Sequence, residues 1–356
     1  MEKIKSLQAL RGLAFLGIFL GHVGSKVEWG TLGASLFFCL SGFLLMYRAG
    51  NERTVCTIKD SLQFAKDKLK KIYPLHIITM VIVIAYNVAE IIYWKNPLLT
   101  FGRFIIPGAV LNITLLQCWI PDDRVNISLN PVSWYLSTAA FLYFIFPYVC
   151  KYVRAKSYKK SITVCGLILL GEIFLCALFI SVFGTNNHGY GWFMYYFPVF
   201  RIGDLMAGVI LGRMCKENYF HGRSANYYTL LEILTIAAYI LFITWNKNVQ
   251  VNNALLQATK NRTTLYVPIA AMSVYLFYRR KGAITSFLCN EILEKLGNIS
   301  SAAFLIHYPV IYWISLFILA FNIQFKGMRI IIPVLEFIIT VFVSKIVCSK
   351  KYVNRH

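Results

Sequence analysis

Charged residues are few in this sequence, and acidic residues are fewer than basic ones. Charged residues make up 14% of the 356 residues, whereas about a quarter is usual in soluble globular domains. Hydrophobic residues make up 58%, so an ordinary soluble domain is excluded. Lys and Arg number 36 against 15 Asp and Glu. They gather in short segments between apolar stretches, which favours the positive-inside rule over nucleic-acid binding.

Several other signals are missing. The nine cysteines include no CxxC pair, and no histidine has a ligand-like spacing, so neither a disulfide framework nor a metal site is expected. No A-x-A cleavage site follows Val23, so the apolar run after residues 1–5 should remain as the first transmembrane helix. Without internal repeats, low-complexity tracts or an appended soluble segment, residues 1–356 are predicted to form one membrane domain.

What the sequence does hold is a series of apolar stretches, as expected for an all-α polytopic membrane bundle. They lie at about 7–24, 30–48, 72–94, 104–118, 132–150, 161–183, 193–213, 227–246, 263–279, 298–321 and 328–348. A crossing needs about 20 mostly apolar residues. The short stretch 104–118 contains Pro107, Gly108 and Asn112, which favours a re-entrant or interfacial segment.

Basic loops orient the bundle. If the N-terminus is cytoplasmic, the seven Lys/Arg of 48–71 and the five of 151–160 should lie on the same side. An even number of crossings must then lie between 72 and 150, and this agrees with the assignment of 104–118. The sequence therefore predicts about ten transmembrane helices, with both termini in the cytoplasm.

Two titratable residues of the first helix share one face. Arg11 and His22 are eleven residues apart, which places them within about 20° of each other and about 16 Å apart along a helix. Arg11 would lie near the cytoplasm and His22 towards the outer side. A neutral imidazole there could accept a proton from a hydroxyl. A backbone-bonded His22 and an Arg11 that only follows the positive-inside rule explain the spacing equally well.

Other polar residues in predicted spans have two interpretations each. Arg201 and Asp204 can pair at i,i+3, either structurally or beside a donor channel or acceptor pocket. His307, placed near the inner side, could assist proton transfer or bind donor, or be a packing histidine. Trp134 is an interface anchor or a platform for a sugar. Ser41 belongs to a Ser-Gly pair that favours close helix packing over substrate contact. Three acidic residues receive no assignment: Glu172, Glu232 and Glu336.

Six motifs in order along the chain resemble the membrane acyltransferase 3 family. They are the R-x10-H spacing within Leu10–His22, the FFCLSGFLL core of Leu36–Leu45, Lys71–Pro74, Pro131–Ser137, Phe200–Gly208 and Leu296–Pro309. Each is weak alone, but six in register are specific, and about ten crossings agree with the family's architecture. No SGNH-type domain of the kind appended in some relatives is seen.

The resemblance implies acyl transfer from acyl-coenzyme A, usually acetyl-coenzyme A, to a hydroxyl of a cell-envelope or exported carbohydrate. It implies that His22 is the catalytic base and that Arg11 helps hold the donor. The family's R-x-x-R element, linked to coenzyme A phosphates, is represented here by Lys68 and Lys71, with Tyr73 in the adjoining motif. Lysine supplies charge but lacks the planar fork of arginine. The glutamate that many relatives have after W-x-L-S is absent from 137–140.

The implied setting is the cytoplasmic membrane of a bacterium, with membrane lipids and a carbohydrate or glycolipid acceptor as partners, and no nucleic acid. Separate envelope-glycan machinery could complete the transfer. The alternative function is a transporter or flippase of a lipid-linked or acidic substrate, which predicts inverted repeats and paired broken helices. An inactive relative that keeps the scaffold for binding is the third hypothesis.

Overall fold

The computed structural model describes residues 4–24, 29–49, 57–94, 105–248, 253–261 and 263–353, and within these ranges all regular structure is helical. The predicted all-α class is confirmed. The longer helices are α1 (Lys5–His22), α2 (Trp29–Arg48), α4 (Tyr73–Tyr93), α7 (Trp134–Ala155), α8 (Tyr158–Phe183), α9 (Ile202–Lys216), α10 (Ala225–Asn248), α12 (Tyr266–Arg279), α14 (Glu291–Ala320) and α15 (Met328–Val353). The shorter ones are α3 (Ile58–Leu69), α5 (Ile106–Thr114), α6 (Asp123–Asn126), α11 (Ala254–Asn261) and α13 (Ala283–Leu288).

Each predicted apolar stretch coincides with a helix in the described ranges. Eight helical segments there are long and apolar enough to cross a membrane, so the chain is an integral membrane protein. Of the remaining predicted crossings, α1 has 18 residues and carries Lys5 and Arg11, and α12 has only 14 residues. The count of about ten crossings depends on these two helices and stays a prediction. Helix α5 has nine residues, too short to span.

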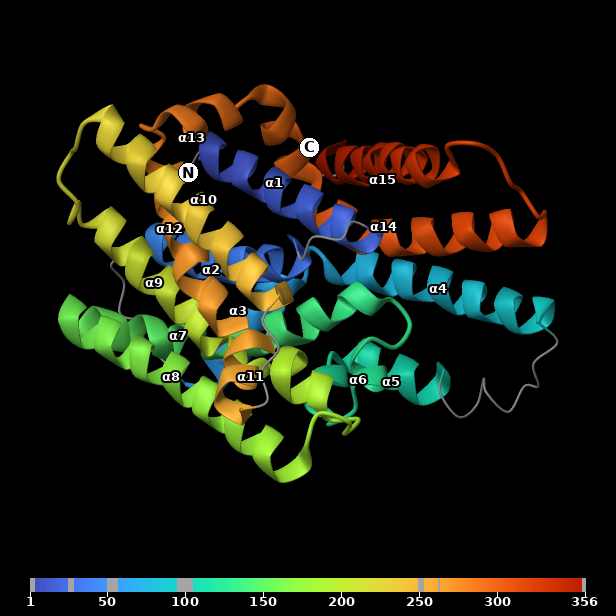
Figure 1. Ribbon diagram of the computed structural model, residues 1–356, viewed down its shortest axis with the longest axis horizontal. Helices are drawn as coiled ribbons and strands as arrows, with labels where there is room; N and C mark the ends of the chain where they lie inside the picture. The colour runs from blue at the N-terminus through green and yellow to red at the C-terminus, as the bar shows by residue number, and fades with distance from the viewer. Residues whose placement is uncertain are drawn as a thin grey trace.

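Two helix pairs form the centre of the bundle, where α1 and α2 lie among the others (Figure 1). α1 runs beside α14, and α2 runs beside α9, both at very short range. A Cβ added at Gly297 would lie 1.8 Å from the Gln8 carbonyl oxygen, and one at Gly208 would lie 1.9 Å from that of Cys39. Gly42 likewise has room only for hydrogen against Leu205. Small residues thus let backbones approach, as predicted for the Ser-Gly pair of α2.

The substitution Gly297→Ala is therefore expected to destabilise the protein by about 3 kcal/mol, the upper end of the usual range for overpacking, because its methyl group would meet backbone that cannot rotate away. The matched control is Gly166→Ala on α8, where a Cβ would have no neighbour within 4 Å. Alanine has the higher helix propensity, so this change should be neutral or slightly stabilising. Thermal unfolding in detergent measures both, and equal melting temperatures would contradict the packing.

The stretch predicted at 193–213 is not one continuous helix. It consists of a π-helical turn at Trp192–Tyr196, a 3-10 turn at Pro198–Arg201, and then α9. Pro198 has no N–H and restricts the residue before it, and Phe197 is accordingly extended, with φ −61° and ψ 118°. The predicted stretch is therefore a candidate span, Trp192–Lys216, whose helix changes type at Phe197.

Helix α3 was missed by the search for apolar stretches because it is amphipathic. A reciprocal capping box begins it: the Asp60 N–H donates to the Thr57 hydroxyl at 3.1 Å, and the Thr57 N–H donates to the Asp60 carboxylate. Its Phe64 ring stacks on Phe146 of α7, with centroids 5.2 Å apart. This docking fixes the position of Lys68 at the end of α3.

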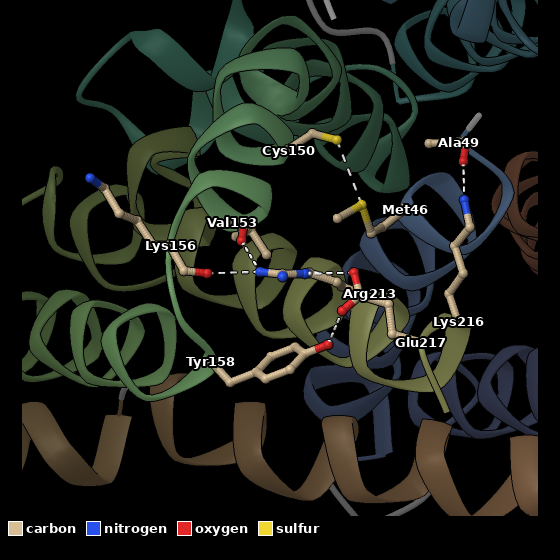
Figure 2. A network of polar contacts seen from close by, with 9 residues as sticks. All are labelled: Met46, Ala49, Cys150, Val153, Lys156, Tyr158, Arg213, Lys216 and Glu217. Atoms are coloured by element: carbon tan, nitrogen blue, oxygen red, sulfur yellow. Dashed lines mark hydrogen bonds and ion pairs between the residues drawn. The ribbon is translucent and has the colours of Figure 1, made fainter. Parts of the chain in front are cut away.

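Polar side chains tie together the ends of α7, α8 and α9 (Figure 2). The Arg213 guanidinium donates to the carbonyls of Val153 and Lys156, and to the Glu217 carboxylate at 2.9 Å. The Tyr158 hydroxyl donates to the same carboxylate. Because the last carbonyls of a helix have no partner within it, Arg213 completes the end of α7.

One of the unassigned acidic residues has a structural role. Glu232 on α10 is buried and accepts hydrogen bonds from the backbone N–H groups of Ile284 and Thr285, at 2.8 and 3.1 Å, and from the Thr285 hydroxyl. It therefore caps the N-terminus of α13, where unpaired N–H groups favour a negative charge.

Candidate active site

A cavity of about 320 Å³ opens among α1, α2, α3, α4, α7, α14 and α15, and we call it the cationic cavity. Arg11, Lys68 and Lys71 line it, and no carboxylate does so among the described residues. Most of the rest of its wall is apolar or aromatic, including Phe37, Tyr135 and Tyr143, with a few neutral polar side chains among them. A mostly apolar cavity with three cations suits a long ligand whose phosphorylated end carries several negative charges.

Hydroxyl groups hold Arg11 in this cavity. Its Nε donates to Ser300 Oγ at 3.3 Å, and its Nη2 donates to Ser301 Oγ. Both serines belong to α14 and also line the cavity. Since these partners are neutral, they orient the guanidinium without neutralising its charge. Ser41 lies on the same wall, with its hydroxyl donating to the Phe37 carbonyl of its own helix at 2.7 Å.

Several positive charges lie close to Lys68 at the cationic cavity. Partial burial lowers the pKa of Lys68, and the positive charges of Lys71 and Arg48 lower it further. The Lys68 ammonium also lies 4.9 Å from the centroid of the Phe64 ring. Repulsion between neighbouring cations costs free energy that a bound polyanion would recover. Burial is the larger cause of the lowered pKa of Lys68, and the smaller part due to Lys71 and Arg48 is the part that a bound anion would offset.

A second cavity, of about 520 Å³, lies beside the end of α1, and we call it the histidine cavity. His22, the last residue of α1, is exposed on its wall. Trp134, Tyr196 and Tyr308 are other lining residues. The His22 ring centroid lies 4.8 Å from that of Tyr308 and 5.3 Å from that of His307. The site thus presents an accessible imidazole beside aromatic faces.

His307 lies directly behind His22, so the prediction that put these residues towards opposite sides of the membrane was wrong. Helix α14 begins at Glu291, before the predicted apolar stretch, whose start was placed too late because the first turns are polar and carry Glu294 and Lys295. His307 therefore lies further along the helix than predicted. The fully buried His307 bonds through Nδ1 to the Ala303 carbonyl at 3.2 Å. If Nδ1 carries the proton, Nε2 is left as an acceptor, and this buried Nε2 has no hydrogen-bond partner in the described structure.

A buried cation, Arg201, packs against the aromatic side chains that line the histidine cavity. The Arg201 guanidinium lies 4.8 Å from the Tyr195 ring centroid and 5.6 Å from that of Trp134, and it donates to the Tyr195 carbonyl at 3.0 Å. Its Nη1 lies 3.8 Å from an Asp204 carboxylate oxygen. The predicted i,i+3 pair is therefore present. Arg201 lines neither of the two cavities, so it lies behind the lining side chains of Trp134 and Tyr195.

Tyr73 lies apart from the other residues assigned to the donor. Its hydroxyl donates to the Ile113 carbonyl of α5 at 2.7 Å, and it does not line the cationic cavity. The contact supplies a partner for a carbonyl at the end of a short helix. A role of Tyr73 in donor binding stays a prediction.

Sequence reasoning missed a buried polar network beneath the histidine cavity. The Asn112 Oδ1 accepts from the Ser133 hydroxyl at 2.6 Å and from Gln117 Nε2 at 3.2 Å, and all three side chains are fully buried. The Asn112 carbonyl bonds His76 Nε2 at 3.0 Å. These bonds support the irregular backbone between α5 and α7, as required where such backbone lies within a membrane protein.

Asn130 bonds a carbonyl of α14 that the internal Pro309 leaves without its helical donor, next to the two histidines. Pro309 has no N–H to donate to the Leu305 carbonyl four residues earlier. Asn130 Nδ2 donates to that carbonyl instead, at 3.0 Å, and is fully buried. The residue thereby fixes the segment of α14 that holds His307 and Tyr308. The Asn-Pro pair that precedes α7 was the visible signal, but the partner lies 175 positions away.

Replacing Asn130 by Ala is accordingly expected to destabilise the protein by about 1–3 kcal/mol, since a buried carbonyl loses its donor. Asn130→Asp removes the donor while keeping the shape, so its melting temperature should fall at least as far. Asn186→Ala, at an exposed position after α8 that lines neither cavity, is the comparison. A melting temperature unchanged in both Asn130 variants would show that Leu305 does not need this donor.

The fold and the two cavities define a polytopic membrane protein with a cationic compartment and a histidine compartment. Residues 4–349 match the model of the family described as an acyltransferase domain, the membrane acyltransferase 3 family. The chain belongs to this family. It is a membrane acyltransferase, and this result favours the enzyme hypothesis over the transporter hypothesis.

Curated relatives carry the same kind of activity in their names. The acyltransferase MdmB of Streptomyces mycarofaciens is 25% identical over 337 residues, which cover 87% of this chain and 79% of the relative. The O-acetyltransferase OatA of Staphylococcus aureus is 22% identical over 370 residues, covering 98% of this chain and 56% of the relative. The chain thus spans little more than half the length of OatA. No solved structure matches.

Proposed function

We propose that this acyltransferase moves an acyl group, acetyl in the first instance, from acyl-coenzyme A to a hydroxyl of a carbohydrate or glycolipid. The donor binds in the cationic cavity, and the acceptor binds in the histidine cavity. One observation carries the proposal: the two cavities lie at opposite ends of the α1 face that bears Arg11 and His22, and they meet at a shared wall. The setting is the cytoplasmic membrane of a bacterium.

The donor site is supported by charge and by length. Arg11, Lys68 and Lys71 supply three positive charges without a lining carboxylate in the described structure, which matches the phosphates of coenzyme A. From Arg11 to His22 the helix rises about 16 Å. A flexible pantetheine arm follows this rise, so that the phosphates stay at the cationic end while the thioester approaches His22.

The chemistry needs one base and no covalent intermediate. His22 accepts the proton of the acceptor hydroxyl as that oxygen attacks the thioester carbonyl carbon. The carbon–sulfur bond breaks, the new ester forms, and protonated His22 returns the proton to the leaving thiolate. His307 stands 5.3 Å away and positions the His22 ring. The Trp134 face offers a surface on which a sugar ring stacks.

Sidedness follows from the basic loops. The cationic cavity is reached near Lys68 and Lys71, in the segment that the positive-inside rule assigns to the cytoplasm. Coenzyme A then enters from the cytoplasm, and the acceptor enters from the opposite side. A separate envelope protein receives the acylated product or brings the acceptor.

The test of this function supplies labelled acetyl-coenzyme A to membranes that contain the wild type, His22→Ala or His221→Ala. His221 is exposed and lines neither cavity, so its variant is the matched histidine control. Wild type and His221→Ala should transfer label to an envelope carbohydrate, and His22→Ala should not. Equal incorporation by all three proteins would contradict the assigned base.

A further inference from the structure

The cationic and histidine cavities share one lining side chain. Among the described residues, Phe304 of α14 is the side chain that lines both the cationic and the histidine cavity. We propose that Phe304, braced by Phe37 and Tyr135, is a partition that keeps the donor thioester from water entering through the histidine cavity. It thereby sets the ratio of acyl transfer to hydrolysis. This inference rests on the proposed function.

Three rings from three helices form the partition. The Phe304 centroid lies 5.4 Å from that of Tyr135 on α7 and 6.2 Å from that of Phe37 on α2, and the latter two are 6.1 Å apart. The interplanar angles of 62–69° are those of edge-to-face contacts. Phe304 is only 8% exposed. Mutual contacts therefore hold each ring, and an opening requires at least one to rotate.

The partition is connected to the base. The Phe304 ring lies 6.0 Å from that of His307, which in turn lies 5.3 Å from that of His22. Phe37 and Tyr135 line the cationic cavity but not the histidine cavity. Phe304 thus faces the thioester on one side and the acceptor on the other, and its rotation is the smallest movement that joins the two compartments.

Water is the competing nucleophile in this arrangement. A base that takes a proton from an acceptor hydroxyl also takes one from water, whose oxygen then attacks the thioester carbonyl carbon. The carbon–sulfur bond breaks, the thiolate receives the proton, and a free carboxylic acid leaves. Because this step differs from transfer only in the nucleophile, exclusion of water must be geometric. Closed sites suppress hydrolysis in this way.

The experiment measures two products from labelled acetyl-coenzyme A, with acceptor present: free acetate and acetylated carbohydrate. In Phe304→Ala the ratio of acetate to acetylated carbohydrate should rise by about tenfold or more, because the compartments become continuous. Phe43→Ala is the matched control, since Phe43 is a fully buried aromatic of α2 that lines neither cavity. Its ratio should equal that of the wild type.

A milder variant guards against misfolding. If thermal unfolding shows that Phe304→Ala is not folded, Phe304→Leu is the test, and its ratio should rise in the same direction by about threefold. An unchanged ratio in a folded Phe304 variant, or an equal rise in Phe43→Ala, would overturn the partition. The proposed function fails separately: it falls if the wild type transfers no label, or if His22→Ala transfers as much as wild type.

Discussion

Turnover should fall by about 10²–10⁴-fold when His22 is replaced by Ala, the range typical for loss of a general base. Coenzyme A affinity should stay within about twofold of wild type, because His22 lines the histidine cavity and not the cationic one. Turnover at saturating donor, together with direct coenzyme A binding, checks both. Equal losses in turnover and in donor affinity would mean that His22 acts in donor binding.

His22 as an acyl carrier is the competing mechanism for the same residue, since histidine can also act as a nucleophile. Direct attack predicts that wild-type protein incubated with labelled acetyl-coenzyme A, without acceptor, carries no covalent label. Label that stays on the chain, and is lost in His22→Ala, would contradict direct attack and establish the relay.

His307→Ala should retain more activity than His22→Ala, because His307 is fully buried and touches His22 only from behind.

Loss of the cavity cations should have the second large effect. Arg11→Ala is expected to weaken coenzyme A binding by about 1.5–3 kcal/mol, roughly 10- to 150-fold, since it removes charged hydrogen bonds to phosphate. Lys68→Ala combined with Lys71→Ala should weaken binding less, and mainly at low salt, because both lysines are exposed. Binding titrations at two salt concentrations separate the contributions.

Lys70 provides the control within the same segment. It is exposed and lies between the two cavity lysines in sequence, but it does not line the cationic cavity. Lys70→Ala should therefore bind coenzyme A nearly as wild type does at each salt concentration. If Lys70→Ala weakened binding as much as the double variant, the effect would be one of net charge and not of a site.

Much of the fold could be predicted from the sequence because the bilayer imposes a simple rule on composition. Each apolar stretch coincides with helical structure, and 104–118 was recognisable as too short to cross. Helix α3 was not predicted because seven of its twelve residues are polar, although its Thr57–Asp60 capping box is visible in the sequence. Pro198 is the sequence signal for the change of helix type before α9.

Only part of the candidate site could be predicted from the sequence. The 11-residue spacing of Arg11 and His22 predicted a shared face, and the motifs gave the donor lysines. The pairing of His22 with His307 depends on how α1 packs against α14 at Gly297, which spacing within one helix cannot show. The Asn130–Leu305 bond and the Phe304 partition likewise join residues far apart in sequence. Such contacts follow from packing and not from local pattern.

The central claim is that donor and acceptor reach His22 from opposite sides of the membrane. Sealed vesicles of uniform, determined orientation test it directly, with labelled acetyl-coenzyme A on one face and a carbohydrate acceptor on the other. Transfer is predicted only when coenzyme A is on the face that bears Lys68 and Lys71 and the acceptor is on the opposite face. Transfer in which both substrates act from the same face of intact vesicles would contradict the account.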